Sequence, residues 1–230
     1  MKKRITAVFL LLLTLALTLT LAACDGGELP PREYDEAEVL SAARELIEKS
    51  VLFNRIYFGE GIRYLDSDGV GAYKPADTEW LAQYGITTLE DLKNATRQVF
   101  SEKYCERIFS TTLSSVSDDD GTVVSYARYY QEVSDKGVPL RIMVLSNYDY
   151  YLENPIEYKD DITVFEVVGE IIRLRVPVIL TREDGKTKET FIKVDIIEEE
   201  DGWRLASDTY AIYNESTDRY DELTGGSNNN

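Results

Sequence analysis

The apolar pattern of this 230-residue chain changes period near its middle, and that change limits the folds open to it. From Asp35 onward, apolar residues recur at the spacing of one helix face: Leu40, Ala43, Ile47 and Val51. After Val123 the apolar residues alternate or form short runs bounded by turn residues, which is typical of strands. Helices followed by strands predict an α+β fold, with N-terminal helices packed on a curved antiparallel sheet.

Helix starts are predicted from residues that cap backbone N–H groups. Asp35 and Ser101 each precede a helical pattern, and Asp77 or Thr78 precedes a short one. Thr87 followed by Glu90 matches a capping box. Residues 59–75 are expected to form a loop, and helices are expected to dominate the rest of the first half.

Strands are predicted from the apolar runs of the second half. The expected ranges are 123–133, 140–146, 162–168, 171–181, 191–197, 203–205 and 210–213. Asp184-Gly185 predicts a hairpin turn, and Gly169 a turn or bulge. Short links between consecutive strands predict an antiparallel meander.

Residues 1–23 have the features of an export leader, with basic residues before an apolar run that ends in small residues. The stretch Leu21-Ala22-Ala23-Cys24 resembles the lipobox of bacterial lipoproteins. That resemblance implies cleavage before Cys24, lipidation of its thiol and stable anchoring by acyl chains such as palmitate. A retained transmembrane anchor and an ordinary secretory cleavage are the alternatives.

The predicted address is the outer face of the bacterial cytoplasmic membrane. Asp25, directly after the cysteine, resembles the signal that keeps such lipoproteins in that membrane. Residues 24–33, with paired glycines and paired prolines, are expected to form a flexible tether. Residues 34–214 are expected to form a single α+β domain, and residues 215–230 a disordered polar tail.

Composition narrows the classes of function. The formal net charge is −17, which argues against a nucleic-acid partner and favours a basic partner or a solvated surface. The chain has no histidine, which removes most nucleophile–base pairs and the common zinc sites. With Cys24 assigned to lipid, Cys105 has no partner for a disulfide and is expected to be a small core residue.

Motif searches predict no cofactor, no metal and no catalytic residue. The segments before Gly69, Gly121 and Gly185 lack the ligand spacing of a calcium loop. Asp118, Asp119 and Asp120 therefore predict a solvated turn, and they are candidates for contact with a basic partner. Tyr126, Tyr129 and Tyr130 cluster on one expected strand, where some of them must face the core. Tyrosine gives contact area at low entropic cost, so the segment 146–158 is a second candidate for contact with a partner. Its candidate residues are Tyr148, Asp149, Tyr150 and Tyr151.

Three segments resemble a known family. Residues 87–93 and 99–104 are similar to the helices of secreted cystatin-like or NTF2-like cone domains, and residues 201–210 to their closing strand. Together they resemble the IseA family, inhibitors of the D,L-endopeptidases that cut cell-wall peptides. The resemblance implies a cystatin-like or NTF2-like cone whose closing tryptophan, Trp203, plugs it. It also implies an extracytoplasmic inhibitor that lays a loop into a protease cleft.

The leading hypothesis is thus a membrane-tethered binding lipoprotein that regulates peptidoglycan hydrolases, with a basic-clefted D,L-endopeptidase as the partner. One alternative is a lipoprotein that binds a small ligand inside the cone, in a pocket lined by Trp80, Tyr84 and Trp203. The other is a hydrolase that uses a pair of carboxylates.

Overall fold

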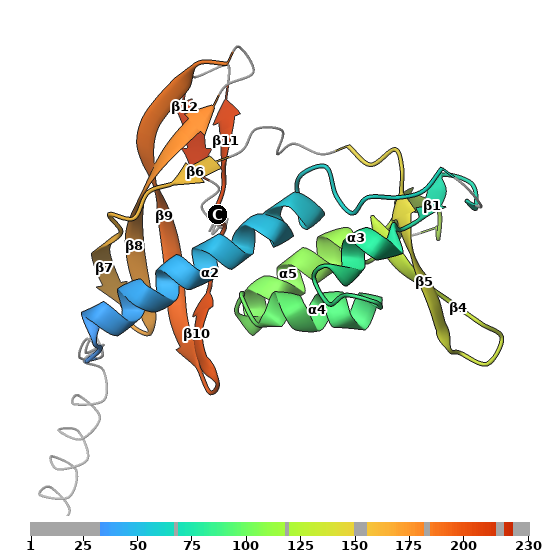
Figure 1. The fold of residues 1–230 in the computed structure, drawn as a ribbon, viewed down its shortest axis with the longest axis horizontal. Helices are drawn as coiled ribbons and strands as arrows, with labels where there is room; N and C mark the ends of the chain where they lie inside the picture. Colours follow the sequence, from blue (N-terminus) through green and yellow to red (C-terminus); the bar gives the residue numbers. More distant parts are fainter. Residues whose placement is uncertain are drawn as a thin grey trace, which may run out of the picture. The chain divides into compact units, whose positions relative to one another are not determined.

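The computed structural model describes residues 33–66, 69–117, 120–149, 156–181, 185–214 and 219–222, with the side chains of 124 and 211–222 excepted. They belong to one compact unit that begins at Glu33 (Figure 1). The unit combines a few helices with a curled antiparallel sheet, which confirms the α+β class.

The described helices are α2 (Glu36–Tyr57), α3 (Thr78–Ala82), α4 (Leu89–Arg97) and α5 (Glu102–Thr112). Asp35 caps α2, because its carboxylate accepts hydrogen bonds from the N–H groups of Ala37 and Glu38. Asp77 and Ser101 cap α3 and α5 in the same way. The predicted helix starts at these three residues are confirmed.

The capping box of α4 lies one residue later than expected. Thr88, not Thr87, is the N-cap, and Asp91, not Glu90, completes the box. The N–H of Leu89, the first helical residue, donates to the side-chain oxygen of Gln131 at 2.8 Å. A side chain that is distant in the sequence therefore adds to the hydrogen bonds at this helix start.

The larger sheet, called the main sheet here, is built on two long strands, β8 (Ile171–Thr181) and β9 (Thr187–Glu199). β10 (Gly202–Leu205) pairs with β9, while β6 (Ile156–Tyr158) and β7 (Thr163–Val168) share the far edge of β8. All pairs are antiparallel, as predicted, and β8 has the predicted bounds. Gly169, with φ of 60°, forms the predicted turn between β7 and β8.

A second sheet, called the small sheet, has the order β1-β5-β4. It contains β1 (Tyr73–Pro75), β4 (Tyr129–Val133) and β5 (Pro139–Leu145). The sequence predicted one meander, and the strand β1 in the middle of a loop-like region was not expected. Two short pairs complete the set, β2 (Val116–Ser117) with β3 (Val123–Ser125), and β11 (Ala211–Asn214) with β12 (Arg219–Glu222).

Two sequence expectations are corrected by these strands. The run 123–133 is divided into β3 and β4. Between them the N–H of Arg128 donates to the carbonyl of Thr112 at the end of α5, so the chain does not continue as one strand. Residues 219–222 form β12 on β11, so this part of the predicted disordered tail is ordered; its other residues lie outside the described residues.

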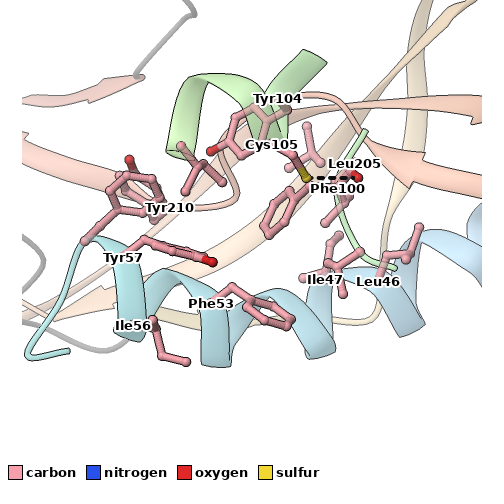
Figure 2. Close-up of a cluster of buried hydrophobic side chains, with 14 of the residues drawn as sticks. Leu46, Ile47, Phe53, Ile56, Tyr57, Phe100, Tyr104, Cys105, Leu205 and Tyr210 are labelled. Atoms are coloured by element: carbon pink, nitrogen blue, oxygen red, sulfur yellow. Dashed lines mark hydrogen bonds between the residues drawn. The ribbon is translucent and has the colours of Figure 1, made fainter. Parts of the chain in front are cut away.

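The hydrophobic core lies between α2, α5 and the main sheet. Phe53 and Tyr57 of α2 extend toward Phe100 and Tyr104, beside Leu205 of β10 (Figure 2). Leu205 also exchanges backbone hydrogen bonds with Val99 and Ser101, which ties the helices to the sheet. Cys105 is 1% exposed and donates to Phe100, which confirms it as a core residue.

Candidate functional site

The structure describes three of the residues expected to bind a partner: Asp120, Tyr148 and Asp149. The others lie outside the described residues: Cys24, Asp118, Asp119, Tyr150 and Tyr151. The three described residues all border strands that lead into or out of the small sheet. The candidate site is therefore built around that sheet.

Asp120 lies in the turn between β2 and β3. Its carboxylate accepts from the N–H of Thr122 at 3.0 Å and from the hydroxyl of Thr122 at 2.7 Å. Gly121 follows with φ of 86°, a conformation that favours glycine. This exposed turn returns the chain to β3, which ends directly before Tyr126.

Tyr148 and Asp149 follow β5 after a tight turn. Ser146 fixes this turn by donating both its N–H, at 3.0 Å, and its hydroxyl, at 2.7 Å, to the carbonyl of Ala72. Tyr148 is half-buried, and its ring lies over the guanidinium of Arg128 with 4.5 Å between the guanidinium carbon and the ring centre. Asp149 is exposed beside it.

Arg128 is 2% exposed and binds the C-terminal end of α2. Its guanidinium donates to the carbonyls of Tyr57 and Gly59. These carbonyls carry the negative end of the helix dipole, which compensates a buried positive charge. The Nε of Arg128 has no hydrogen-bond partner among the described residues.

Tyr129, the first residue of β4, binds the C-terminal end of α2 and the segment that follows it. Its hydroxyl donates to the carbonyl of Ile56 at 2.6 Å and accepts from the N–H of Ile62 at 3.1 Å. Burial raises the pKa of Tyr129 to about 12, so this hydroxyl remains neutral at physiological pH. Tyr129 thus belongs to the core, and the tyrosines on the other side of β4 are the ones available to a partner.

Three tyrosines gather on that other side, and we call this surface the tyrosine face. Tyr73 of β1 and Tyr130 of β4 meet edge to face, with ring centres 4.8 Å apart, across the central strand β5. Met143 of β5, opposite Tyr130 in the ladder, is fully buried. Tyr126 completes the surface and is 57% exposed.

The tyrosine face is partly shielded from water. Burial raises the pKa of Tyr73, and the neighbouring Tyr130 and Tyr126 raise it further. The Tyr73 hydroxyl donates to the carbonyl of Ala127 at 2.6 Å. The sequence drew attention to Tyr126 and Tyr130 but not to Tyr73, because its region was expected to be a loop without strand pairing.

A buried polar cluster near α5 has a structural explanation. The Tyr104 hydroxyl donates to Asp208, which also receives a hydrogen bond from Arg107 at 3.0 Å. Burial and the adjacent Asp208 carboxylate raise the pKa of Tyr104 well above its usual value, so the ring remains protonated. A permanently neutral tyrosine that donates to a carboxylate stabilises the fold and is a poor proton-transfer group.

A second buried cluster joins α2 to the residue that follows Asp208. The hydroxyl of Thr209 lies 2.7 Å from that of Ser50 and accepts from the amide nitrogen of Asn54 at 2.8 Å. Tyr158 of β6 donates to the carbonyl of Thr209. These bonds hold the segment after β10 against the C-terminal half of α2.

The aromatic residues expected to line a ligand pocket do not lie together. Trp203 donates to Glu38 in the first turn of α2, whereas Trp80 lies under Arg55 in the last turn and packs against Tyr84. The two turns are about 25 Å apart along the helix. A single pocket lined by both tryptophans is therefore contradicted, and the rings in Figure 2 occupy the space beneath α5.

Within the part of the chain that the structure describes, no group of three acidic or cysteine side chains is arranged to hold a metal ion. None of the helices described has both the length and the apolar character to cross a bilayer.

Comparison with known proteins gives no assignment. No protein-family model, no curated protein and no solved structure matches the chain.

Proposed function

We propose that the protein is a binding lipoprotein that regulates or inhibits a cell-wall hydrolase, most concretely a D,L-endopeptidase. Cys24 would carry the lipid at the outer face of the cytoplasmic membrane. The tyrosine face and the two turns beside it would contact the enzyme. The curled sheet with helices on it would be a cone of the cystatin-like or NTF2-like kind.

The observation that carries this proposal is the exposed tyrosine face. Tyr126 is 57% exposed while Tyr73 and Tyr130 are half-buried against each other. Rigid rings of this kind lose little entropy on binding, and tyrosine is enriched at the centres of protein interfaces. Asp120 and Asp149 are exposed. In the sequence, their turns lie just before Tyr126 and just after β5.

Charge supports a basic partner. The net charge of −17 speeds encounter with a positively charged cleft, and exposed carboxylates such as Asp120 and Asp149 contribute at the rim. The aromatic surface then supplies the contact that persists after encounter. Inhibition follows from occlusion of the cleft and needs no chemistry from this chain.

The proposal is tested by adding the lipid-anchored chain, in vesicles, to a purified D,L-endopeptidase that is cutting wall fragments. Wild-type protein should inhibit, and raising the salt concentration should weaken inhibition by slowing association. Tyr126→Ala should weaken inhibition about tenfold or more, as expected for loss of an aromatic anchor.

Phe165→Ala is the matched control, because Phe165 lies on β7 of the main sheet and is 55% exposed. Its loss should leave inhibition unchanged. Full enzyme activity in the presence of excess wild-type protein would overturn the proposed function.

A further inference from the structure

The main sheet carries rows of charged side chains on its outer face, the face turned away from the core. Every buried residue of β8 and β9 is even-numbered, so the odd-numbered residues lie on this outer face. In one row, Glu166 of β7 and Asp195 of β9 lie on either side of Arg173 of β8. Arg173 binds both carboxylates, each at 2.8 Å, so the positive charge in this row is matched by acids.

The next row along β8 has no acid. The register places Arg175 of β8 between Thr163 of β7 and Lys193 of β9. Two positive side chains thus occupy directly opposite positions, where like charges repel. Arg175 is exposed, and among the residues that the structure describes it forms no ion pair. Compared with the row of Arg173, this row lacks the carboxylate that would bind its arginine.

Arg175 is held in a geometry that suits a carboxylate. Its guanidinium carbon lies over Phe191, 3.9 Å from the ring centre. A guanidinium that stacks on a ring still presents its in-plane N–H donors, and a carboxylate can accept two parallel hydrogen bonds from them. The contact with the ring restricts the side chain before a ligand binds, which lowers the entropic cost of binding.

Apolar side chains adjoin Arg175 on the same face of the sheet. Pro177 lies directly opposite Phe191, and Ile179 is the next outer residue of β8. All three of these apolar side chains are half-buried, so part of each is open to a ligand. A ligand whose carboxylate reaches Arg175 would therefore rest an adjoining apolar group on Pro177 and Phe191.

The charge of the chain favours a ligand with a single negative charge. The net charge of −17 repels polyanions and anionic lipid surfaces. A phosphate monoester carries nearly two negative charges at neutral pH, whereas a carboxylate carries one. The C-terminal end of a peptide places one carboxylate next to one side chain, which matches a cation beside an apolar surface.

We propose that Arg175, with Lys193 opposite it, binds the C-terminal carboxylate of a peptide whose last side chain is apolar. The carboxylate takes the place that acids of the sheet take beside Arg173, and the last side chain lies on Pro177 and Phe191. This site lies on β8 and β9, whereas the tyrosine face lies on β1 and β4. It goes beyond the proposed function and does not depend on it.

The test is calorimetric titration of the purified full chain with three probes. They are N-acetyl-alanyl-phenylalanine with a free carboxylate, the same dipeptide as its amide, and inorganic phosphate. The free acid should bind at least about tenfold more tightly than the amide, because the amide lacks the charged acceptor. It should also bind more tightly than phosphate, and added salt should weaken its binding. No measurable binding of the free acid, equal binding of the amide, or tighter binding of phosphate would overturn the proposal.

Variants of Arg175 then locate the site. Arg175→Met should weaken binding of the free acid about tenfold or more. Arg175→Lys keeps the charge but not the planar fork, and it should cause a smaller loss. Because Arg175 is exposed, both variants should fold, which circular dichroism checks.

Arg63→Met is the matched control, because it removes the same charge from an exposed position outside the main sheet. It should leave binding of the free acid unchanged. Wild-type affinity in a folded Arg175→Met chain, or an equal loss in Arg63→Met, would contradict the site. Either result leaves the proposed function standing, since inhibition of the hydrolase is measured separately.

Discussion

The ring of Tyr148 lies over the guanidinium of Arg128, with 4.5 Å between the guanidinium carbon and the ring centre. The same guanidinium binds the carbonyls of Tyr57 and Gly59 at the end of α2. One buried cation therefore joins the end of a helix, the start of β4 and the first turn of the segment that follows β5. The position of Tyr148 depends on a residue twenty positions earlier in the sequence.

Replacement of Arg128 should destabilise the protein more than replacement of an exposed arginine. Arg128→Met leaves two buried carbonyls without donors, which should lower the free energy of unfolding by about 2 kcal/mol or more. Arg175→Met is the control, because Arg175 also stacks on a ring, that of Phe191 at 3.9 Å, but is exposed. Denaturant unfolding measures both, and equal effects would contradict the role of Arg128.

Thr209 should be more important for stability than an exposed threonine. Thr209→Val keeps the shape but removes the partner of Ser50 and of the Asn54 amide, both buried. The expected loss is about 1–3 kcal/mol in the free energy of unfolding. Thr163→Val, at an exposed position of β7, should change it by less than about 0.5 kcal/mol.

The capping box of α4 gives a prediction that separates neighbouring carboxylates. Asp91 accepts from Thr87 and Thr88, and these bonds lower its pKa to about 2. Asp91→Asn should reduce the melting temperature, whereas Glu90→Gln, which removes only surface ion pairs, should change it little. The contribution of Asp91 should be present above pH 3.8 and lost as the pH falls toward 2.

Alkaline pH should unfold the protein cooperatively. Burial raises the pKa of Tyr129 and Tyr158 to about 12 from 10.0, and that of Cys105 to about 12 from 9.0. The unfolded chain loses these protons first, so stability is full below pH 9.0 and falls as the pH rises toward 12. Between its unfolded and folded pKa, each such group lowers the free energy of unfolding by about 1.4 kcal/mol per pH unit.

Tyrosinate absorbance and circular dichroism, recorded together during the titration, provide the measurement. The buried tyrosines should ionise in the same step in which secondary structure is lost. Ionisation of all sixteen tyrosines near pH 10.0 in a chain that stays folded would contradict the buried environments described above.

Local sequence predicted what local contacts determine. Asp35, Asp77 and Ser101 cap helices whose first turns they can reach, and β8 follows its apolar run without deviation. The sequence did not separate Thr87 from Thr88, because each is followed three residues later by an acid, Glu90 or Asp91. Gln131 of β4 adds a contact to this helix start that no local pattern shows.

The candidate site likewise combines features that local sequence shows with features that depend on contacts between distant segments. The tyrosines of residues 126–130 were visible as a cluster, but which of them face the core depends on α2. Tyr129 is buried because its hydroxyl bonds to Ile56, and Tyr130 is left for the other side. Tyr73 was missed because only pairing with β5 makes its segment a strand. Packing between distant segments therefore forms the tyrosine face.

The hydrogen bonds of Thr209 to Ser50 and Asn54 span sequence separations of 159 and 155 residues. Helix α2 is made early, yet its polar partners arrive only after nearly the whole chain has been synthesised. Contacts this remote in sequence are typical of slow folding, since a long loop must close before they form. The buried polar groups of α2 therefore remain without these partners until the segment after β10 is present.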